Sequence, residues 1–322
     1  MKAQTVILIS LTLLITASCT PAANPTPSAP QQITIAMGYI PNVQFAPFYV
    51  AVEKGYFAQE NITLKFDYGW ETDILKLVGT GEIPFAVASG DQVLLARSQG
   101  LPVVYIVNWY RRFPVAVVSL AEKGIQKPAD LKGKKIGIPA LFGASYIGWR
   151  ALLYAEGLDE KDFQLQEIGY TQVASLVKGL VDAAVCYAMN EPVQLRQEGH
   201  KVNVIPVADY MNLVSNGLIT NEETIRNNPK LVEGVARAFL RGLEYTINHP
   251  DEAFEISKKY VKEMGDDQKA VLEAAIEFWS GPELGKSDRA TWEATRKIME
   301  EMGLLTREIN VEEAFTNRFV ER

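Results

Sequence analysis

The stretch from residue 33 to 57 constrains the fold most, because it combines a strand, a turn and a helix in one unit. Residues 33–37 form a short, β-branched apolar run that is typical of a buried strand. Gly38 ends this run, and Pro47 suits the first turn of the helix that follows. In open α/β sheets, ligands bind beside such loops, at the carboxyl ends of the strands. The loop residues that we expect to face a cleft are Tyr39, Asn42 and Phe45.

Strand and helix patterns alternate along the rest of the chain. One series extends from residue 62 to 107 and a second from 115 to 206, and a strand pattern at 217–220 then returns to the first series. From residue 228 onward the patterns are helical, the last of them near 311–319. This alternation is typical of parallel sheets covered by helices. We therefore predict an α/β fold of two lobes, connected by two crossings, with a helical C-terminal tail.

The lobe boundaries follow from these patterns. We expect residues 33–113 together with 217–322 to form a discontinuous first lobe, and residues 114–216 to form the second. A chain of 322 residues exceeds the usual size of one domain, which agrees with this division. Two lobes that are connected twice in this way form a hinged clamp.

The N-terminal segment is predicted to lie outside the fold. An apolar run at 6–15, too short to span a bilayer as a mature helix, and the small residues after it predict a secretory signal over residues 1–18. The pattern resembles a bacterial lipoprotein signal, in which Cys19 would be acylated, although Thr16 stands where such signals usually carry Leu. An ordinary signal peptide that is cleaved nearby is the alternative. Residues 19–32 are rich in Pro, Ala, Ser and Thr and are predicted to be a tether.

Composition excludes several classes of protein. Hydrophobic residues at 48% and charged residues at 22% are close to average usage. This balance excludes a disordered chain and a polytopic membrane protein. A formal net charge of −7 provides no basic surface for nucleic acid. Small molecules and other proteins are the partners that this composition allows.

Aromatic side chains gather at or just after the predicted strand ends. Their flat faces favour a planar, conjugated ligand, and each stacking pair contributes about 0.5 to 1.5 kcal/mol beyond area burial. The alternative for each residue taken singly is a place in the core. The aromatic candidates are Tyr39, Phe45, Trp70, Trp109, Tyr110, Phe142, Tyr146, Tyr170 and Tyr187.

Polar candidates lie in the same loops. Asn190 and Glu191 precede Pro192 at a predicted helix start, where they would either cap the helix or present an amide and a carboxylate to a ligand. The segment 142–145 resembles an anion-binding helix start, but no P-loop pattern accompanies it, and polyol hydroxyls could use the same N–H groups. Asp91 is equally suited to bind a ligand or to cap a helix. The polar candidates are Asn42, Asp91, Asn108, Ser145, Asn190 and Glu191.

Catalytic and metal-binding patterns are weak. The only histidines, His200 and His249, belong to no cluster with metal-ligand spacing, so we predict no metal site. Cys186 lies in a buried-strand pattern without a nearby base, and we expect it to be a small core residue. We therefore predict no catalytic residues.

Several segments resemble one family. They are similar to the ABC-importer substrate-binding proteins related to thiamine-pyrimidine precursor binders. This similarity extends from about residue 33 to the C-terminal helices and implies the two-lobe clamp of type II, the periplasmic-binding-protein-like fold. The segments that carry it are 38–42, 46–51, 54–57, 85–90 and 130–137.

Two positions depart from the pyrimidine-precursor binders, which typically carry His near the position of Phe45 and a Trp-containing segment before the acid near Glu191. The segments 43–47 and 190–195 look more like the riboflavin-binding lipoproteins of RibXY-type transporters. This resemblance implies a lipid-anchored protein on the outer face of the cell membrane. It would capture riboflavin as the transported ligand, without a cofactor, and deliver it to an ABC permease. We expect it to be a monomer and not an enzyme.

Three alternatives stay open at this point. A binding protein for a thiamine pyrimidine precursor would belong to the same family. Fungal pyrimidine synthases also resemble this chain, so an enzyme is the alternative of a different class, although secretion and the lack of a histidine at the predicted cleft argue against it. A sensory receptor could use the same clamp.

Overall fold

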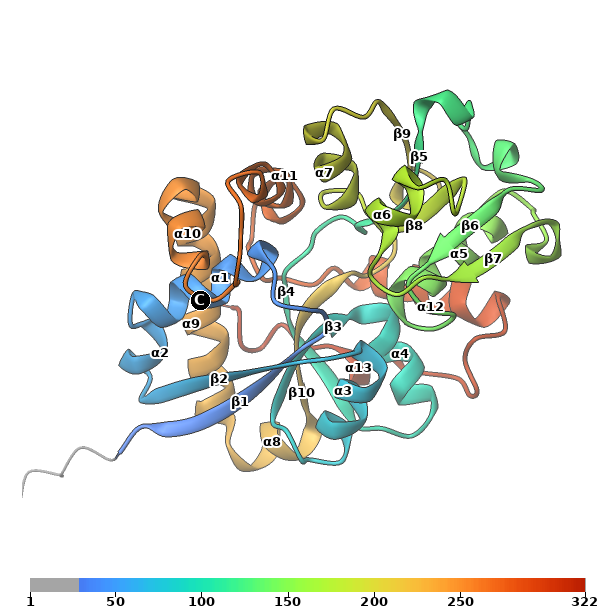
Figure 1. Ribbon diagram of the computed structural model, residues 1–322. Helices are drawn as coiled ribbons and strands as arrows, with labels where there is room; N and C mark the ends of the chain where they lie inside the picture. The colour runs from blue at the N-terminus through green and yellow to red at the C-terminus, as the bar shows by residue number, and fades with distance from the viewer. Residues whose placement is uncertain (1–28, 322) are drawn as a thin grey trace, which may run out of the picture.

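The computed structural model describes residues 29–321, which form two lobes, each built on a five-stranded sheet (Figure 1). The strands of the first sheet are β1 (Gln31–Met37), β2 (Ile62–Tyr68), β3 (Phe85–Ser89), β4 (Val103–Asn108) and β10 (Asn216–Asn221). Those of the second are β5 (Val115–Leu120), β6 (Lys135–Ile138), β7 (Gln164–Glu167), β8 (Ala183–Tyr187) and β9 (Val202–Pro206). The predicted α/β fold is confirmed. The predicted signal 1–18, Cys19 and the tether as far as residue 28 lie outside the described residues.

The strand order shows how the chain crosses between the lobes. The first sheet has the order β2-β1-β3-β10-β4, in which β1 runs parallel to β2 and β3, whereas β10 runs antiparallel to β3 and β4. The second has the order β7-β6-β8-β5-β9, and β5 runs antiparallel to β8 and β9. Both sheets are therefore mixed, not wholly parallel as predicted. The reason is that β5 and β10 each enter from the other lobe, at the edge where the parallel strands end.

Helices cover both sheets. Those that precede the first crossing are α1 (Ala46–Glu53), α2 (Tyr56–Gln59), α3 (Glu71–Gly79) and α4 (Gly90–Ser98). The second lobe contains α5 (Gly143–Ala155), α6 (Gln172–Val177) and α7 (Glu191–Gln197). After β10 come α8 (Glu222–Asn227), α9 (Pro229–Asn248), α10 (Pro250–Ser257), α11 (Gln268–Trp279), α12 (Arg289–Glu301) and α13 (Val311–Ala314). Short 3-10 helices are η1 (Val43–Phe45), η2 (Ala121–Lys123), η3 (Pro128–Leu131), η4 (Glu160–Asp162) and η5 (Val207–Asp209). Within residues 29–321, we find no helix with the length and hydrophobicity that a membrane crossing requires.

The helix α1, which follows the loop after β1, packs closely against α9. Gly242 of α9 makes this approach feasible, because a Cβ atom there would lie 2.1 Å from the Pro47 carbonyl oxygen and 2.8 Å from Ala51 Cβ. Phe48 and Phe239 meet at the same interface, with ring centroids 4.4 Å apart. This packing fixes the position of the loop that precedes α1.

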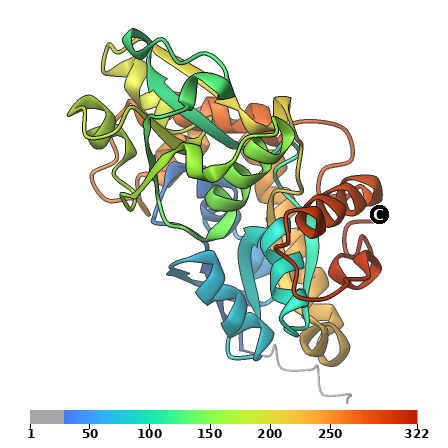
Figure 2. The same cartoon turned by 90° about the vertical axis from the view of Figure 1, so that its right-hand side faces the viewer.

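The C-terminal helices contact both lobes. In Figure 2 the second lobe, drawn in green and yellow, lies above the first, and the red C-terminal helices lie along one side. α11 packs against α7, and Arg150 of α5 donates a 3.4 Å hydrogen bond to the carbonyl oxygen of Met302, just after α12. The hydroxyl of Tyr154, also on α5, donates to the carboxylate of Glu301. The tail therefore connects the lobes on the outside of the molecule.

Candidate ligand-binding site between the lobes

A pocket lies between the two lobes, beside the loops that follow their strands, and is lined by residues of both lobes. From the first lobe it is lined by Gly38, Tyr39, Gln44, Phe45, Trp70, Glu71, Val87, Trp109, Tyr110 and Asn216. From the second it is lined by Pro139, Phe142, Gly143, Ala144, Ser145, Tyr170, Gln172, Cys186, Tyr187, Asn190 and Glu191.

Most of the predicted ligand-binding residues meet at this pocket. They are separated in the sequence, but the strand order brings the loops that carry them to facing edges of the two sheets. Their contact with a ligand stays a prediction. The predicted residues that line the pocket are Tyr39, Phe45, Trp70, Trp109, Tyr110, Phe142, Ser145, Tyr170, Tyr187, Asn190 and Glu191.

Asn42 and Asp91 do not line the pocket. The Asn42 side chain accepts a 2.9 Å hydrogen bond from the backbone N–H of Gln44 and so caps η1. Asp91 is fully buried in the first turn of α4, where its carboxylate accepts a 3.2 Å hydrogen bond from Gln92. Of the two alternatives left open for Asp91, a helix cap does not hold, because Ser89 is the N-cap residue of α4. Both side chains are used within the first lobe.

Asn108 and Tyr146 also lie outside the pocket. Asn108 accepts a 3.0 Å hydrogen bond from the hydroxyl of Tyr105 and donates one of 3.3 Å to the carbonyl oxygen of Lys286. The hydroxyl of Tyr146 donates to the carboxylate of Glu160, with both oxygens 3.3 Å away. The Asn108 side chain, at the end of β4, and the Tyr146 side chain, on α5, each contact residues of their own lobe. The sequence therefore showed that both residues lie near a strand end, but it did not show in which direction their side chains point.

Aromatic rings meet across the pocket. Trp70 of the first lobe stacks on Tyr170 of the second, with ring centroids 4.7 Å apart and planes 24° from parallel. The Trp70 ring also meets Phe142 edge to face at 5.4 Å, and the Tyr39 ring meets Tyr170 edge to face at 4.7 Å. These contacts join the two lobes at the pocket, and the Trp70 and Tyr170 faces are occupied by each other.

Three further aromatic residues form the inner wall on the first lobe. Trp109 is 1% exposed, and its ring centroid lies 6.1 Å from that of Phe45 and 5.1 Å from that of Tyr110. Within the described residues, the indole N–H of Trp109 has no hydrogen-bond partner. The hydroxyl of Tyr110 donates a 3.2 Å hydrogen bond to Gln44. These residues are buried in the core and also line the pocket, so a place in the core and a place at the ligand site are not exclusive alternatives.

Asn190 is the N-cap residue of α7 by position, but its side chain makes no capping hydrogen bond. Its amide nitrogen donates to the Tyr39 hydroxyl of the other lobe at 3.4 Å and to Glu191 at 3.2 Å. Its amide oxygen accepts a 2.7 Å hydrogen bond from Gln194. The structure therefore favours the alternative in which this amide faces the cleft.

Glu191 is buried beside Asn190, and its carboxylate accepts a 3.2 Å hydrogen bond from the backbone N–H of Tyr187. Burial raises the pKa of Glu191 to about 7, against the hydrogen bonds that it accepts. A carboxyl group with this pKa exchanges a proton near neutral pH and can accept or donate a hydrogen bond.

Glu71 is a second buried carboxyl group at the pocket. It accepts hydrogen bonds of 3.1 Å from the backbone N–H of Ser89 and 3.2 Å from the amide of Asn216. The pKa of Glu71 is raised to about 8, mainly by burial and then by the nearby Asp91 carboxyl. The backbone N–H groups of Ala144 and Ser89 oppose that rise.

Sequence reasoning did not select every lining residue. Glu71 directly follows Trp70 in a rim loop, and this adjacency could have identified it. Asn216 precedes the strand pattern 217–220, and its amide oxygen accepts a 3.0 Å hydrogen bond from the Tyr187 hydroxyl across the lobes. The lining residues that were not selected are Gly38, Gln44, Glu71, Val87, Pro139, Gly143, Ala144, Gln172, Cys186 and Asn216.

In the part of the chain that the structure describes, the side chains that line the pocket include acids but no base. Within residues 29–321, none of the side chains that line it is Lys, Arg or His. No group of three or more His, Cys, Asp or Glu residues in this part of the chain could hold a metal ion. The polar groups are amides, hydroxyls and the two carboxyl groups, set among aromatic rings.

Two mixed sheets, two crossings and a pocket between facing loops define the two-lobe clamp of the periplasmic-binding-protein fold. Solved structures with this fold include the alkanesulfonate-binding protein SsuA from Xanthomonas axonopodis pv. citri. That structure has a TM-score of 0.72, is 15% identical, and is matched over 90% of this chain and 99% of its own. The aliphatic sulphonate-binding protein SsuA from Escherichia coli has a TM-score of 0.72 at 14% identity, over 88% of this chain and 97% of its own.

The chain belongs to the NMT1/THI5-like family, whose profile matches residues 42–253. It is 45% identical to riboflavin-binding protein RibY of Chloroflexus aurantiacus, over 95% of this chain and 91% of that protein. It is 30% identical to the formylaminopyrimidine-binding protein of Halalkalibacterium halodurans, over 98% and 99% of the two chains. A 4-amino-5-hydroxymethyl-2-methylpyrimidine phosphate synthase of Legionella pneumophila is 23% identical, over 91% and 93%. The family and the fold predicted from the sequence are both confirmed.

Proposed function

We propose that this chain is the substrate-binding component of an ABC importer and that its ligand is riboflavin. The observation that carries this proposal is the 45% identity to riboflavin-binding protein RibY, which extends over 95% of the chain. The pocket supports it physically. Riboflavin combines a flat isoalloxazine ring with a ribityl chain of hydroxyl groups. The rings of Trp70 and Tyr170 offer parallel faces from opposite lobes, and the side chains of Asn190 and Asn216 offer hydrogen-bonding partners.

Binding would close the clamp. A ligand that contacts both lobes binds the closed state better than the open one, and so shifts the population toward it. In the structure the lobes already meet through the Trp70–Tyr170 stack and the hydrogen bond from Asn190 to Tyr39. We propose that the ring enters between the Trp70 and Tyr170 faces, which then move apart to admit it.

The remaining parts of the proposal follow from the sequence. Cys19 would carry a lipid anchor, so that the protein acts as a monomer on the outer face of the cell membrane and delivers its ligand to a permease. Residues 33–113 with 217–322, and 114–216, would be the two lobes that move relative to each other, with Asn216 itself at the start of β10 in the first sheet. We propose a binding protein and not an enzyme, since two relatives that are 45% and 30% identical over nearly the whole chain are binding proteins.

A pyrimidine is the second candidate ligand. The relative that supports it is the formylaminopyrimidine-binding protein, which is 30% identical over nearly the whole length of both chains. A substituted pyrimidine is also flat and uncharged, but it is smaller than isoalloxazine and has no ribityl chain.

Titration of riboflavin fluorescence with the purified chain distinguishes the two candidates. We expect saturable quenching with one ligand per chain, and no competition from formylaminopyrimidine. Tyr170→Ala should weaken binding about tenfold or more, because an aromatic contact and its buried area are lost. Tyr56→Ala is the matched control, since Tyr56 lies on α2, outside the pocket, and should leave affinity unchanged. Absence of quenching, with stabilisation by the pyrimidine, would favour the second candidate.

A further inference from the structure

Gln172 differs from the other amides that line the pocket. It lies on the second lobe and is 4% exposed, and within residues 29–321 its side chain makes no hydrogen bond. The side chains of Asn190 and Asn216 each donate and accept hydrogen bonds, and that of Gln44 accepts one. Gln172 is therefore the lining amide whose N–H donors and carbonyl acceptor both find no partner in this part of the chain.

A buried amide without partners raises the free energy of the folded chain. Burying an unpaired polar group is costly, and nearly all buried polar groups in folded proteins are hydrogen-bonded. Leucine has nearly the same size and would fill this position without that cost. The amide of Gln172 thus indicates that its partner is a molecule bound in the pocket.

The backbone that carries Gln172 is held in place. Gln172 is the first residue of α6, and the Thr171 hydroxyl just before it donates a 2.6 Å hydrogen bond to the carbonyl oxygen of Ile168. The Thr171 carbonyl oxygen accepts a 2.8 Å hydrogen bond from the backbone N–H of Ser175. Because this backbone is already ordered, less freedom is lost when the amide binds a ligand.

Gln172 is close in sequence to an aromatic ring that we propose to stack on the ligand. Tyr170, two residues earlier, lines the pocket from the same lobe and stacks on Trp70 of the opposite lobe. A flat ring that enters between these two faces would present its edge to residues next to Tyr170. Gln172 would then meet the hydrogen-bonding atoms of that edge.

The edge of isoalloxazine that suits a primary amide is its cyclic imide. There the N3–H donor lies between the carbonyl acceptors at C2 and C4. A glutamine side chain also places an N–H donor beside a carbonyl acceptor, so the two groups can form a pair of hydrogen bonds. An aminopyrimidine offers a similar edge, in which a ring nitrogen accepts and the amino group donates.

We propose that Gln172 is a specificity-determining residue: its carbonyl oxygen accepts a hydrogen bond from the ring N3–H, and its amide N–H donates one to a neighbouring ring carbonyl. The inference rests on the proposed function for the identity of the ring. It assigns the imide edge to the second lobe, beside Tyr170.

Quenching of flavin fluorescence by the full chain measures this pairing. The analogue 3-methylriboflavin cannot donate from N3, so its affinity for wild type should be lower than that of riboflavin by about tenfold or more. Gln172→Leu removes both hydrogen-bonding groups at nearly constant size. It should weaken riboflavin binding about tenfold and bring the two dissociation constants within about threefold of each other.

The matched control is the same substitution outside the pocket. Gln197 is exposed at the end of α7, and Gln197→Leu should leave both dissociation constants unchanged. Lumiflavin, which has the same ring but no ribityl chain, identifies the part of the ligand that is bound. Gln172→Leu should weaken lumiflavin and riboflavin by the same factor. A loss for riboflavin alone would assign Gln172 to the ribityl chain and overturn the proposal.

Thermal unfolding in the absence of ligand distinguishes binding from a structural role. Since the Gln172 side chain makes no hydrogen bond within residues 29–321, Gln172→Leu should not lower the melting temperature. A lower melting temperature would show that the amide supports the fold, and would overturn the proposal.

Failure of the riboflavin assignment would give a different result. If wild type binds no flavin but is stabilised by formylaminopyrimidine, the proposed function fails, and Gln172 should pair with the amino group and ring nitrogen of the pyrimidine. Gln172→Leu should then lose about half or more of the rise in melting temperature that the pyrimidine causes, and Gln197→Leu should keep it. An undiminished response of Gln172→Leu to whichever ligand wild type binds would overturn the role of Gln172.

Discussion

At the scale of single residues, two buried carboxyl groups distinguish this pocket from an ordinary aromatic cleft. The pKa of Glu191 is about 7 and that of Glu71 about 8, both raised mainly by burial. Such groups hold their protons in the folded chain at pH values where a solvated glutamate is ionised. Their cost to stability therefore depends on pH.

We expect the free energy of unfolding to fall as pH rises from about 5 to 8. Glutamate in an unfolded chain has a pKa of about 4.3, so the folded chain binds more protons in this interval. The stability linked to Glu71 and Glu191 is complete below the unfolded pKa and is lost as pH rises through the folded values of about 8 and about 7. The slope is at most about 1.4 kcal/mol per pH unit for each group. Urea unfolding at about pH 5.5, 7 and 8.5 measures it.

The control for this pH dependence is removal of each acid. Glu71→Gln and Glu191→Gln should each flatten the decline of stability between about pH 5.5 and 8.5. A decline of the same slope in both variants would show that other groups are responsible.

Gly38 provides a second test at this scale. We expect Gly38→Ala to lower the free energy of unfolding by about 1 to 3 kcal/mol, because its Cβ would clash with Glu71 Cγ and the Val87 carbonyl oxygen. Gly69→Ala, in a loop nearby, is the matched control, since the nearest atom to its Cβ is Ile74 Cγ1 at 4.0 Å. That variant should change stability by less than about 0.5 kcal/mol. An equal loss of stability in both variants would contradict the close packing around Gly38.

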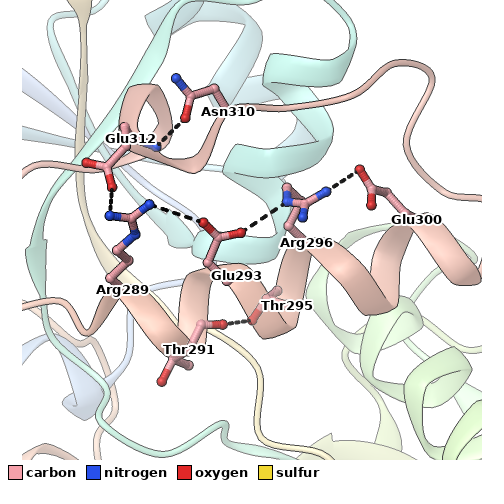
Figure 3. Close-up of polar contacts among 8 residues, drawn as sticks. All are labelled: Arg289, Thr291, Glu293, Thr295, Arg296, Glu300, Asn310 and Glu312. Carbon is pink, nitrogen blue, oxygen red and sulfur yellow. Dashed lines mark hydrogen bonds and ion pairs between the residues drawn. The ribbon is translucent and has the colours of Figure 1, made fainter.

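At the scale of elements, α12 shows which contacts hold the second crossing. Figure 3 shows its exposed side, where charged residues form a chain of contacts with α13. Arg289 pairs with Glu312 at 2.9 Å and with Glu293 at 3.7 Å, and Arg296 pairs with Glu300 at 2.6 Å. Such exposed pairs contribute little, typically about 0 to 1 kcal/mol each. The buried side of the helix contributes more.

Thr295 is the buried contact that we expect to matter. Its hydroxyl accepts a 3.0 Å hydrogen bond from the backbone N–H of Val214, in the segment that leads into β10. Thr295→Val would leave that N–H buried without a partner, and should lower the free energy of unfolding by about 1 to 3 kcal/mol. Arg289→Ala is the exposed control, with an expected loss below about 1 kcal/mol. A larger loss in the control would contradict this ranking.

The sequence predicted where most helices and strands lie, but it predicted less well in which direction the strands run and where the elements end. The strand and helix patterns of the series 115–206 correspond to the second lobe, in which the short strand patterns at 135–138 and 202–206 match β6 and β9. The composition of an apolar run does not show whether a strand is parallel or antiparallel to its neighbours. The sequence therefore did not predict that β5 and β10 run antiparallel to the strands beside them. The last helix was predicted near 311–319 but ends at Ala314, since Phe315 leaves it to form a bridge with Tyr105 of β4.

The sequence likewise predicted only part of the candidate site. Rim loops are visible in sequence, and they led to Tyr39, Trp70 and Tyr170, which meet in space. The direction of a side chain depends on tertiary contacts, and for this reason the sequence did not show that Asn108, at the end of β4, and Tyr146, on α5, contact other residues and do not line the pocket. Glu71 was not selected because its carboxyl group becomes part of a site only where the second lobe faces it. The sequence alone does not show how the two lobes face each other.

At the scale of the whole molecule, the lobes meet through aromatic and polar contacts from opposite sides of one pocket. The Trp70–Tyr170 stack and the Tyr187–Asn216 hydrogen bond both cross between the lobes. We expect the ligand-free chain in solution to open about the two crossings, and riboflavin to close it. Small-angle scattering should therefore show a smaller radius of gyration with saturating riboflavin. An unchanged radius would indicate a rigid pair of lobes.

The central claim is that one flat, uncharged ligand is held between the two lobes. The most direct measurement is a crystal structure of the chain with riboflavin. We predict the isoalloxazine ring between the side chains of Trp70 and Tyr170, with contacts to both lobes. A ring that touches a single lobe, or that lies outside the pocket, would contradict the account.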